Sequence, residues 1–291
     1  MIAFTERRRR MRELLSGTAC LLPASVHDAV SARIAQDLGY ETLMLAGSVA
    51  SLAVLGAPDL ILLTLTELAE QVRRICRASD VPLLVDADHG YGNALNAMRT
   101  VEELENAGAC ALSIEDTVLP RPFGDGAVRL ASIEEGVGKM RAALAGRKDP
   151  ALAIAGRTSA LAVTGSGDAV ARAQAYAAAG VDAIFLVGAT SRAQVEAVSA
   201  AVRLPLILGG ASGELGDPAW LAAHRVRIRI PPHLPFQAAV QALHATLAAL
   251  RAGTPAGQLP DLPGAGAMQR VTRATDYARW TDELLGGSGK G

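Results

Sequence analysis

The sequence predicts an α/β protein with the (β/α)8 barrel (TIM barrel) fold, and three observations carry that prediction. Apolar, β-rich runs recur at intervals of a few tens of residues along the 291-residue chain. Helical patterns, with apolar residues three and four positions apart, lie between most of these runs. Glycine often marks the exchange from helix to strand, as at Gly108 and Gly180. Eight alternating units of this kind predict parallel strands joined by right-handed crossovers, closed into a barrel.

The predicted strands are short runs rich in Ala, Val, Ile and Leu, at residues 19–22, 42–45, 82–85, 111–114, 152–155, 183–187, 205–208 and 226–230. The predicted helices span residues 31–38, 66–77, 95–106, 133–145, 169–179, 193–202 and 238–252. A doubly wound sheet is the structural alternative. A sheet of that type that bound a dinucleotide would need a glycine fingerprint after its first strand, and none follows it.

We expect residues 1–291 to form a single barrel domain, with residues 252–291 as a C-terminal connector and helix. Residues 252–267 are rich in Gly and Pro, which is typical of a connector, and residues 275–285 could form one last helix. A helix behind a long connector is a candidate for docking on a neighbouring subunit. The run from Arg7 to Arg10 is interpreted as the solvated start of an N-terminal helix rather than as a basic binding patch.

Composition excludes several classes of partner. The 28 Lys and Arg residues nearly balance the 29 Asp and Glu residues, so neither a nucleic acid nor an anionic membrane surface is expected to bind. The sequence contains no apolar run of 18 or more residues, so no membrane span is expected. The three cysteines, Cys20, Cys76 and Cys110, are odd in number and far apart, which indicates a reducing compartment and predicts a cytoplasmic protein.

Two acidic clusters stand at the ends of neighbouring predicted strands. Asp86 and Asp88 close the third apolar run, and Glu115 and Asp116 close the fourth. A carboxylate at the end of a buried strand is costly unless a cation meets it. In a barrel of this type the active site lies at the carboxyl ends of the strands, so the two clusters should face one another. The pattern predicts an oxygen-ligand site for a hard divalent cation such as Mg²⁺, and helix capping or pairing with Arg is the alternative, above all for Asp116.

Three further residues at strand ends are candidates for binding a substrate. Arg157 follows the fifth strand, and its guanidinium suits a substrate carboxylate as well as a structural pair with Glu115. Ser48 follows the second strand near a helix start, where it could hold an anion or form a plain tight turn. His233 follows the eighth strand and could hydrogen-bond a carboxylate, move a proton or make a simple loop contact.

The chain resembles the isocitrate lyase / phosphoenolpyruvate mutase superfamily in the segments that carry these residues. They are Gly-Ser-Val-Ala-Ser at 47–51, Asp-Ala-Asp-His-Gly-Tyr-Gly-Asn at 86–93, Ser-Ile-Glu-Asp at 113–116 and Gly-Arg-Thr at 156–158. Longer stretches at 31–35, 93–101 and 134–139 resemble its oxaloacetate decarboxylase branch more closely. The resemblance runs from about Leu14 to Leu250.

The resemblance implies a (β/α)8 barrel with an exchanged C-terminal helix, in a homotetramer built as a dimer of dimers. It also implies Mg²⁺ or Mn²⁺ as the cofactor and an α-keto dicarboxylate as the substrate. By motif position it makes Asp86 the direct metal ligand. The carboxylates that hold metal-bound waters would then be Asp59, Asp88 and Glu115, and the substrate contacts would be Ser48, Arg157 and His233, the last two catalytic.

The reaction implied is the Mg²⁺-dependent decarboxylation of oxaloacetate to pyruvate and CO2 through a metal-stabilised enolate. Residues 119–126, after the fourth strand, lack the Lys-Lys-Cys-Gly-His loop of the superfamily's carbon–carbon lyases, which argues against cleavage of isocitrate or methylisocitrate. Two alternatives stay open. One is a lyase or hydrolase that acts on another substituted keto or hydroxy dicarboxylic acid. The other is a barrel that binds a dicarboxylate without turning it over.

Overall fold

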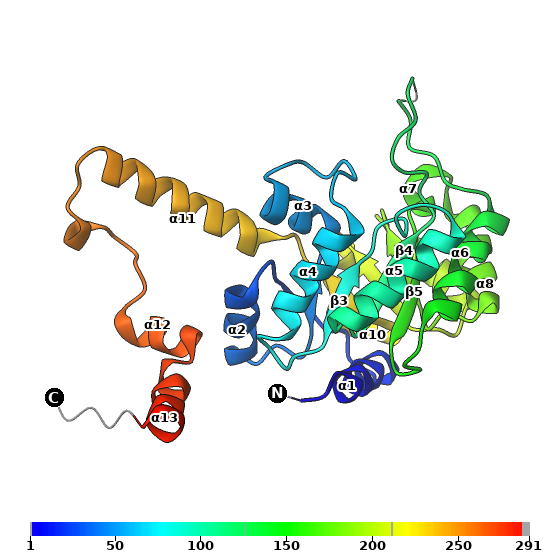
Figure 1. Ribbon diagram of the computed structural model, residues 1–291. Coiled ribbons are helices and arrows are strands. Elements are labelled where there is room, and N and C mark those ends of the chain that lie inside the picture. The colour runs from blue at the N-terminus through cyan, green and yellow to red at the C-terminus, as the bar shows by residue number, and fades with distance from the viewer. Residues whose placement is uncertain (1, 125, 211, 287–291) are drawn as a thin grey trace. The chain divides into compact units, whose positions relative to one another are not determined.

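The computed structural model describes residues 2–124, 126–210 and 212–286. Within them an eight-stranded parallel sheet has its strands in chain order, with helices packed around it (Figure 1). The strands are β1 (Ala24–Ser25), β2 (Leu43–Leu45), β3 (Leu83–Asp86), β4 (Ala111–Glu115), β5 (Ala153–Thr158), β6 (Ala183–Val187), β7 (Leu206–Gly209) and β8 (Val226–Ile230). This order of parallel neighbours confirms the predicted (β/α)8 barrel and excludes the doubly wound alternative, whose strand order reverses.

The helices that the structure describes are α1 (Phe4–Ser16), α2 (Ala29–Asp37), α3 (Gly47–Leu55), α4 (Leu65–Cys76), α5 (Ala94–Ala107), α6 (Ile133–Gly146), α7 (Ala160–Val163), α8 (Ser166–Ala179), α9 (Arg192–Ala201), α10 (Pro218–Ala223), α11 (Leu234–Arg251), α12 (Ala265–Thr272) and α13 (Ala274–Leu285). The seven predicted helices match α2, α4, α5, α6, α8, α9 and α11 to within a few residues at each end. No range was predicted for the short helices α3, α7, α10 and α12, although a helix start was expected near Ser48. None of the described helices is both long and apolar enough to span a membrane.

The first predicted strand was placed too early in the chain. The apolar run at 19–22 contributes only an isolated bridge, in which Leu21 pairs with Ile228 of β8. Pro23 follows this run, and it has no N–H group to continue the ladder with β8. After it, the Ala24 and Val26 amides donate to the carbonyls of Thr42 and Met44 on the β2 side. The chain therefore leaves β8 and joins β2 at the proline, and this exchange closes the barrel between its last and first strands.

The interpretation of the arginine run as solvated was wrong for Arg7 and Arg8, which are only 1% and 5% exposed. Arg7 donates to the carbonyls of Cys76 and Ser79, at 2.5 and 2.6 Å. Arg8 donates to the carbonyls of Ala109 and Glu105. These carbonyls lie where helices end and strands begin, so α1 crosses the amino-terminal end of the barrel and its arginines bind the chain there (Figure 1).

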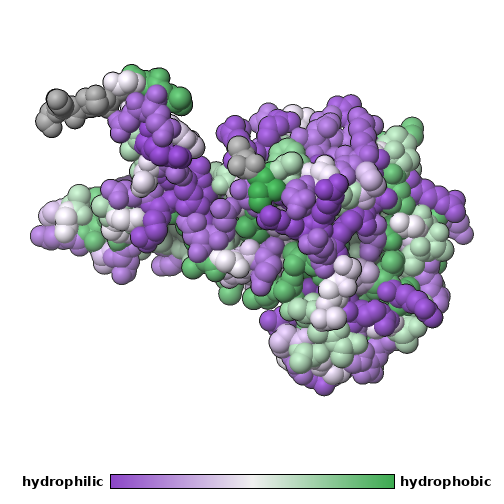
Figure 2. All heavy atoms as spheres, turned by 90° about the horizontal axis from the view of Figure 1, so that it is seen from below, coloured by the Kyte–Doolittle hydropathy of each residue, from purple (hydrophilic) through white to green (hydrophobic). Residues whose placement is uncertain are grey.

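The described contacts divide the chain into two compact units, residues 1–234 and 235–291. The first unit is the barrel, whose strand side chains are almost all buried. The second contains most of α11, then α12 and α13, and none of the residues in these three helices is buried. Apolar side chains lie on its surface (Figure 2). On α11 they form a single stripe at Val240, Leu243, Leu247 and Leu250, with the spacing of one helix face.

Candidate active site

The acidic turn after β3 is fastened to β4 by backbone hydrogen bonds. Asp86 ends β3 and pairs in register with Ser113, whose hydroxyl donates to Asp86 Oδ1 over 3.1 Å. The amide of Ala87 donates to the Ser113 carbonyl, and the amide of Glu115 donates to the Asp88 carbonyl over 2.8 Å. Asp86, Asp88 and Glu115 are all buried. The two predicted acidic clusters therefore meet at one end of the barrel, as the strand pattern predicted.

Arg157 lies between Asp86 and Glu115. Its Cα is the register partner of Glu115 across the β4–β5 pair. The guanidinium donates to Asp86 Oδ2 over 2.5 Å and lies 3.5 Å from Glu115 Oε2. It also sits over the ring of Phe185, 5.3 Å from the ring centroid. The structural pairing that the sequence left open is thus present, with Asp86 as the closer partner.

The remaining carboxylate, Asp59, comes from the loop between α3 and α4. It lines one cavity together with Asp86 and Arg157, and an adjoining cavity together with Asp88 and Glu115. The first cavity has a volume of about 740 Å³ and the second about 390 Å³. Asp59 therefore joins the strand-end acids although it lies on no strand.

The carboxylates raise one another's affinity for protons. Burial raises the pKa of Asp59, Asp88 and Glu115, and the negative charge of Asp86 raises each of them further. Arg157 opposes this shift at all three. Burial by itself would lower the pKa of Arg157, but Asp86 and Glu115 raise it. The site thus concentrates oxygen ligands whose mutual repulsion a single guanidinium offsets only in part.

Gly47 allows the acidic turn to approach the start of α3. A Cβ atom at this position would lie 2.4 Å from Asp88 Oδ1, so any other residue would force the carboxylate of Asp88 to move. The carboxylate of Asp88 therefore rests against the helix amino terminus, where free N–H groups favour negative charge. Ser48, in the same first turn, lines the larger cavity, so it belongs to a helix start and not to a plain turn.

His233 lines the larger cavity from the loop after β8. Its Nδ1 lies 2.8 Å from the hydroxyl of Ser25, the last residue of β1. Burial lowers the pKa of His233, and Asp86 opposes that shift. The larger cavity thus brings together Ser48, Asp59, Asp86, Arg157 and His233. Asp88 and Glu115 line the adjoining one.

Two polar residues that the sequence did not single out support the site. Ser25 was missed because the first strand was misplaced, so it did not read as a strand-end residue. The Lys139 ammonium, buried on α6, donates to the carbonyl of His89 in the acidic turn over 3.0 Å. Burial and then the charge of Lys139 lower the pKa of His89 to about 4, so this ring is neutral. The contact that supports the turn is made by the backbone carbonyl of His89 with Lys139.

Asp116 belongs to a structural pair, the alternative that the sequence left open for it. It is fully buried, and its Oδ2 accepts hydrogen bonds from Arg172 over 3.0 Å and from the Tyr176 hydroxyl over 2.6 Å. Arg172 also donates to the Ala131 carbonyl. These contacts hold the base of the segment that leaves the barrel after β4 and returns at Leu130.

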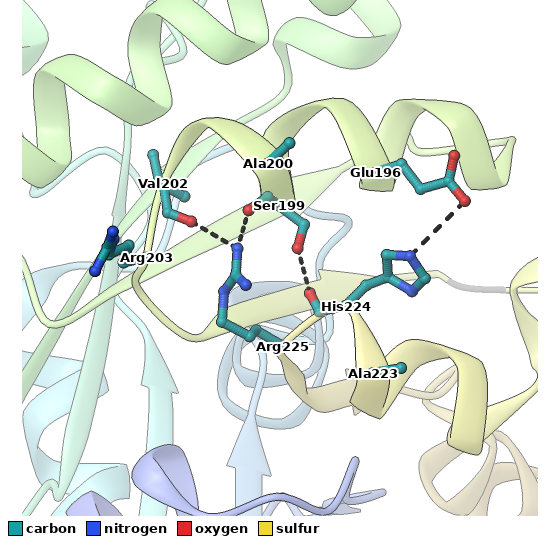
Figure 3. Close-up of a pocket in the computed structure, with 8 residues that line it drawn as sticks. All are labelled: Glu196, Ser199, Ala200, Val202, Arg203, Ala223, His224 and Arg225. Carbon is teal, nitrogen blue, oxygen red and sulfur yellow. Dashed lines mark hydrogen bonds and ion pairs between the residues drawn. The ribbon is translucent and has the colours of Figure 1, made fainter.

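A further cavity lies at the opposite end of the barrel, between α9 and the start of β8 (Figure 3). The Arg225 guanidinium donates to the carbonyls of Ser199 and Val202, at the end of α9. The His224 ring lies 3.7 Å from Glu196. The hydrogen bonds of Arg225 and of the Ser199 hydroxyl join the end of α9 to the start of β8, so we interpret this cavity as structural.

Comparison with known proteins agrees with this geometry. The family model described as phosphoenolpyruvate phosphomutase matches residues 11–251. The chain belongs to this family. An oxaloacetate decarboxylase of Bradyrhizobium diazoefficiens is 58% identical over 284 residues, which cover 97% of this chain and 99% of that protein. The superfamily resemblance and its decarboxylase branch are therefore confirmed.

Solved structures of the family superpose over almost the whole chain. An oxaloacetate acetylhydrolase in complex with 3,3-difluorooxalacetate has a TM-score of 0.83 and 27% identity, covering 98% of this chain and 99% of that one. A phosphonopyruvate hydrolase in complex with oxalate and Mg²⁺ also has a TM-score of 0.83 and 27% identity, covering 96% and 99%. Both structures contain a small dicarboxylate.

Proposed function

We propose that this chain decarboxylates oxaloacetate to pyruvate and CO2, with Mg²⁺ or Mn²⁺ as its cofactor. The observation that carries the proposal is the group of strand-end carboxylates around Arg157, open to a cavity, in a chain 58% identical to an oxaloacetate decarboxylase. The free thiols of the three cysteines fit a reducing compartment, and we place the activity in the cytoplasm.

The donor set fits a hard divalent cation. Four carboxylates, Asp59, Asp86, Asp88 and Glu115, line the two adjoining cavities, and burial with mutual repulsion raises the pKa of Asp88 well above its ordinary value. No three side chains of His, Cys, Asp or Glu among the described residues form a ready-made metal cage. Mg²⁺ needs no such cage, because it binds through one or two carboxylates and keeps several waters. We assign Asp86 as the direct ligand and the other three as partners of bound water.

The chain's own residues would bind and orient the substrate. The Arg157 guanidinium suits a carboxylate, and its contact with Phe185 fixes the plane of the fork. The hydroxyl of Ser48 and the start of α3 offer donors to a second anionic group. His233 would hydrogen-bond the bound acid from the loop after β8, in the wall of the same cavity. When bound, the cation would supply Lewis-acid stabilisation of the negative charge that develops as CO2 leaves.

Steady-state assays with metal-depleted protein test the proposal. Pyruvate and CO2 should form in equal amounts from oxaloacetate only after Mg²⁺ or Mn²⁺ is restored. Asp86→Asn should abolish turnover at any Mg²⁺ concentration. Asp88→Asn serves as the matched control, because this residue acts through water. Its loss should lower the affinity for Mg²⁺ by about 10–100-fold and leave turnover at saturating Mg²⁺. Metal-dependent turnover in Asp86→Asn would remove the direct-ligand assignment.

Hydrolysis of the same acid is the second candidate, favoured by the structural match to the oxaloacetate acetylhydrolase. It would give oxalate and acetate instead of pyruvate and CO2, so product analysis by NMR separates the two reactions. Isocitrate and 2-methylisocitrate should remain unchanged in the same assay. Tight binding of oxaloacetate with no product of either kind would favour the non-catalytic binding barrel.

We further propose that the chain forms a homotetramer, a dimer of dimers, in which its C-terminal helix docks on a neighbouring subunit. The support is the unburied apolar stripe on α11 and the exposed apolar face of α13, where Tyr277, Trp280 and Leu284 share one side. Truncation after Ala252 should yield smaller and less stable species by multi-angle light scattering. A truncated chain that remained fully tetrameric would contradict the docking of α13.

A further inference from the structure

The hydrogen bond between Ser25 and His233 joins the two edges of the barrel at the cavity. Ser25 ends β1 and is only 5% exposed. His233 follows Pro231 and Pro232 after β8, and the two residues are 208 positions apart in the chain. The two prolines restrict the backbone before His233, and the hydrogen bond to Ser25 at 2.8 Å holds the ring itself. The contact is therefore a fixed feature of the cavity wall.

The chemistry of the pair decides which ring nitrogen carries hydrogen. A neutral imidazole has one N–H donor and one acceptor nitrogen. Among the described residues, the Ser25 hydroxyl has no hydrogen-bond partner besides His233 Nδ1. If the hydroxyl only accepted, its proton would be buried without an acceptor, which costs free energy. The favoured arrangement has Ser25 Oγ–H donating to Nδ1, and this leaves the hydrogen of the ring on Nε2.

We propose that Ser25 is a positioning residue that holds His233 as the Nε2–H tautomer, so that His233 offers a hydrogen-bond donor to the carboxylate of the bound acid. The inference rests on the proposed function for the identity of that acid. It narrows the role of His233, which the sequence left open between a hydrogen-bonding contact and proton transfer. Nε2 has no protein partner among the described residues, and the ring lines the cavity where the acid would bind.

The same arrangement argues against proton transfer from the neutral ring to carbon. If Nε2 gave up its proton, Nδ1 would have to take the Ser25 proton in exchange. That exchange would leave an alkoxide on Ser25, to which no described Lys or Arg donates a hydrogen bond. The proton that replaces CO2 on the product carbon would then come from water, while His233 Nε2–H remains a hydrogen-bond donor throughout.

The full-length protein with Mg²⁺ and ¹⁵N-labelled histidine tests the assignment. Two-bond ¹H–¹⁵N spectra distinguish the two neutral tautomers, and the His233 signals are identified by their absence in His233→Gln. The wild type should show the Nε2–H pattern. Ser25→Ala should show a mixture of tautomers and weaken oxalate binding by about twofold to tenfold, measured by calorimetry, because only part of the population then presents the Nε2–H donor and the ring is no longer held in place. Ser25→Thr keeps the hydroxyl and should restore both readouts.

Ser199→Ala is the matched control, because Ser199 is a buried serine at the far end of the barrel, where its hydroxyl donates to the His224 carbonyl. It should leave the His233 tautomer and oxalate affinity unchanged. An Nδ1–H pattern in the wild type would overturn the inference, and so would wild-type tautomer and affinity in Ser25→Ala. Neither readout depends on turnover, so absence of oxaloacetate decarboxylation would refute the proposed reaction and leave the Ser25 assignment to be decided separately.

Discussion

Replacing Arg7 by Met should destabilise the barrel strongly, whereas the same change at Arg9, two residues along the same helix, should not. Arg7 is 1% exposed, and its guanidinium donates to the carbonyls of Cys76 and Ser79 at 2.5 and 2.6 Å. Arg9 has a side chain that is 66% exposed and a single contact with Glu6 at 3.6 Å. Methionine keeps most of the apolar stem and a similar helix propensity, so the comparison isolates the charged head.

The magnitude follows from the groups left behind. Each hydrogen bond from a charged donor contributes about 1.5–3 kcal/mol, and Arg7→Met leaves two buried carbonyls unpaired. Its ion pair with Asp80, at 2.9 Å, adds less than about 1 kcal/mol, because the Asp80 side chain is 32% exposed. We expect a loss of about 3–5 kcal/mol in the free energy of unfolding for Arg7→Met and less than about 0.5 kcal/mol for Arg9→Met.

Urea unfolding followed by circular dichroism, at one protein concentration for all variants, measures the difference from the transition midpoints. The slope of each transition should be the same in the three proteins, since the same surface is exposed on unfolding. Equal midpoints for Arg7→Met and Arg9→Met would refute the reasoning that Arg7 stabilises the carbonyls between α4 and β3, at the amino-terminal end of the barrel.

Two other predictions concern the active site and acid stability. Arg157→Ala should lower kcat/KM for oxaloacetate by about 100-fold. Arg157→Lys should recover only part of that loss, because one ammonium cannot reach both Asp86 and Glu115. Equal initial rates for Arg157→Lys and the wild type would contradict this. Burial raises the pKa of Asp149, but hydrogen bonds, the first of them from Arg8, lower it to about 2. Because this folded-state pKa lies below the unfolded value, the ionised group stabilises the fold above about pH 4 and loses that effect as the pH falls toward 2. Thermal unfolding of Asp149→Asn should therefore depend less on pH in this window than that of the wild type, and parallel curves would count against it.

Much of the candidate site could be predicted because it depends on local pattern and on strand order. Asp86, Glu115 and Arg157 each end a short apolar run, and parallel strands in chain order bring their carboxyl ends to one side of the barrel. The register then sets Glu115 opposite Arg157. The prediction needed only the identity of each strand-end residue, which the sequence states directly.

The errors share a physical cause, which is that the sequence shows each segment without the segment it meets. The strand at 19–22 has the right composition, but the direction of its pairing changes at Pro23. Arg7 and Arg8 belong to a charged run that is typical of a solvated helix, but in the fold they donate hydrogen bonds to the carbonyls of Ser79 and Ala109. Burial of a charge is decided by its partner, and these partners lie about 70 to 100 residues away in the chain.

The sequence by itself determined the barrel class, the strand-end acids and the family, because periodicity and motif are properties of neighbouring residues. Only the tertiary structure decided that Ser25 meets His233, that Lys139 supports the acidic turn and that Gly47 admits the carboxylate of Asp88. Each of these contacts joins segments far apart in the chain. Their distances depend on how the barrel closes and how its helices pack, and no local pattern encodes that packing.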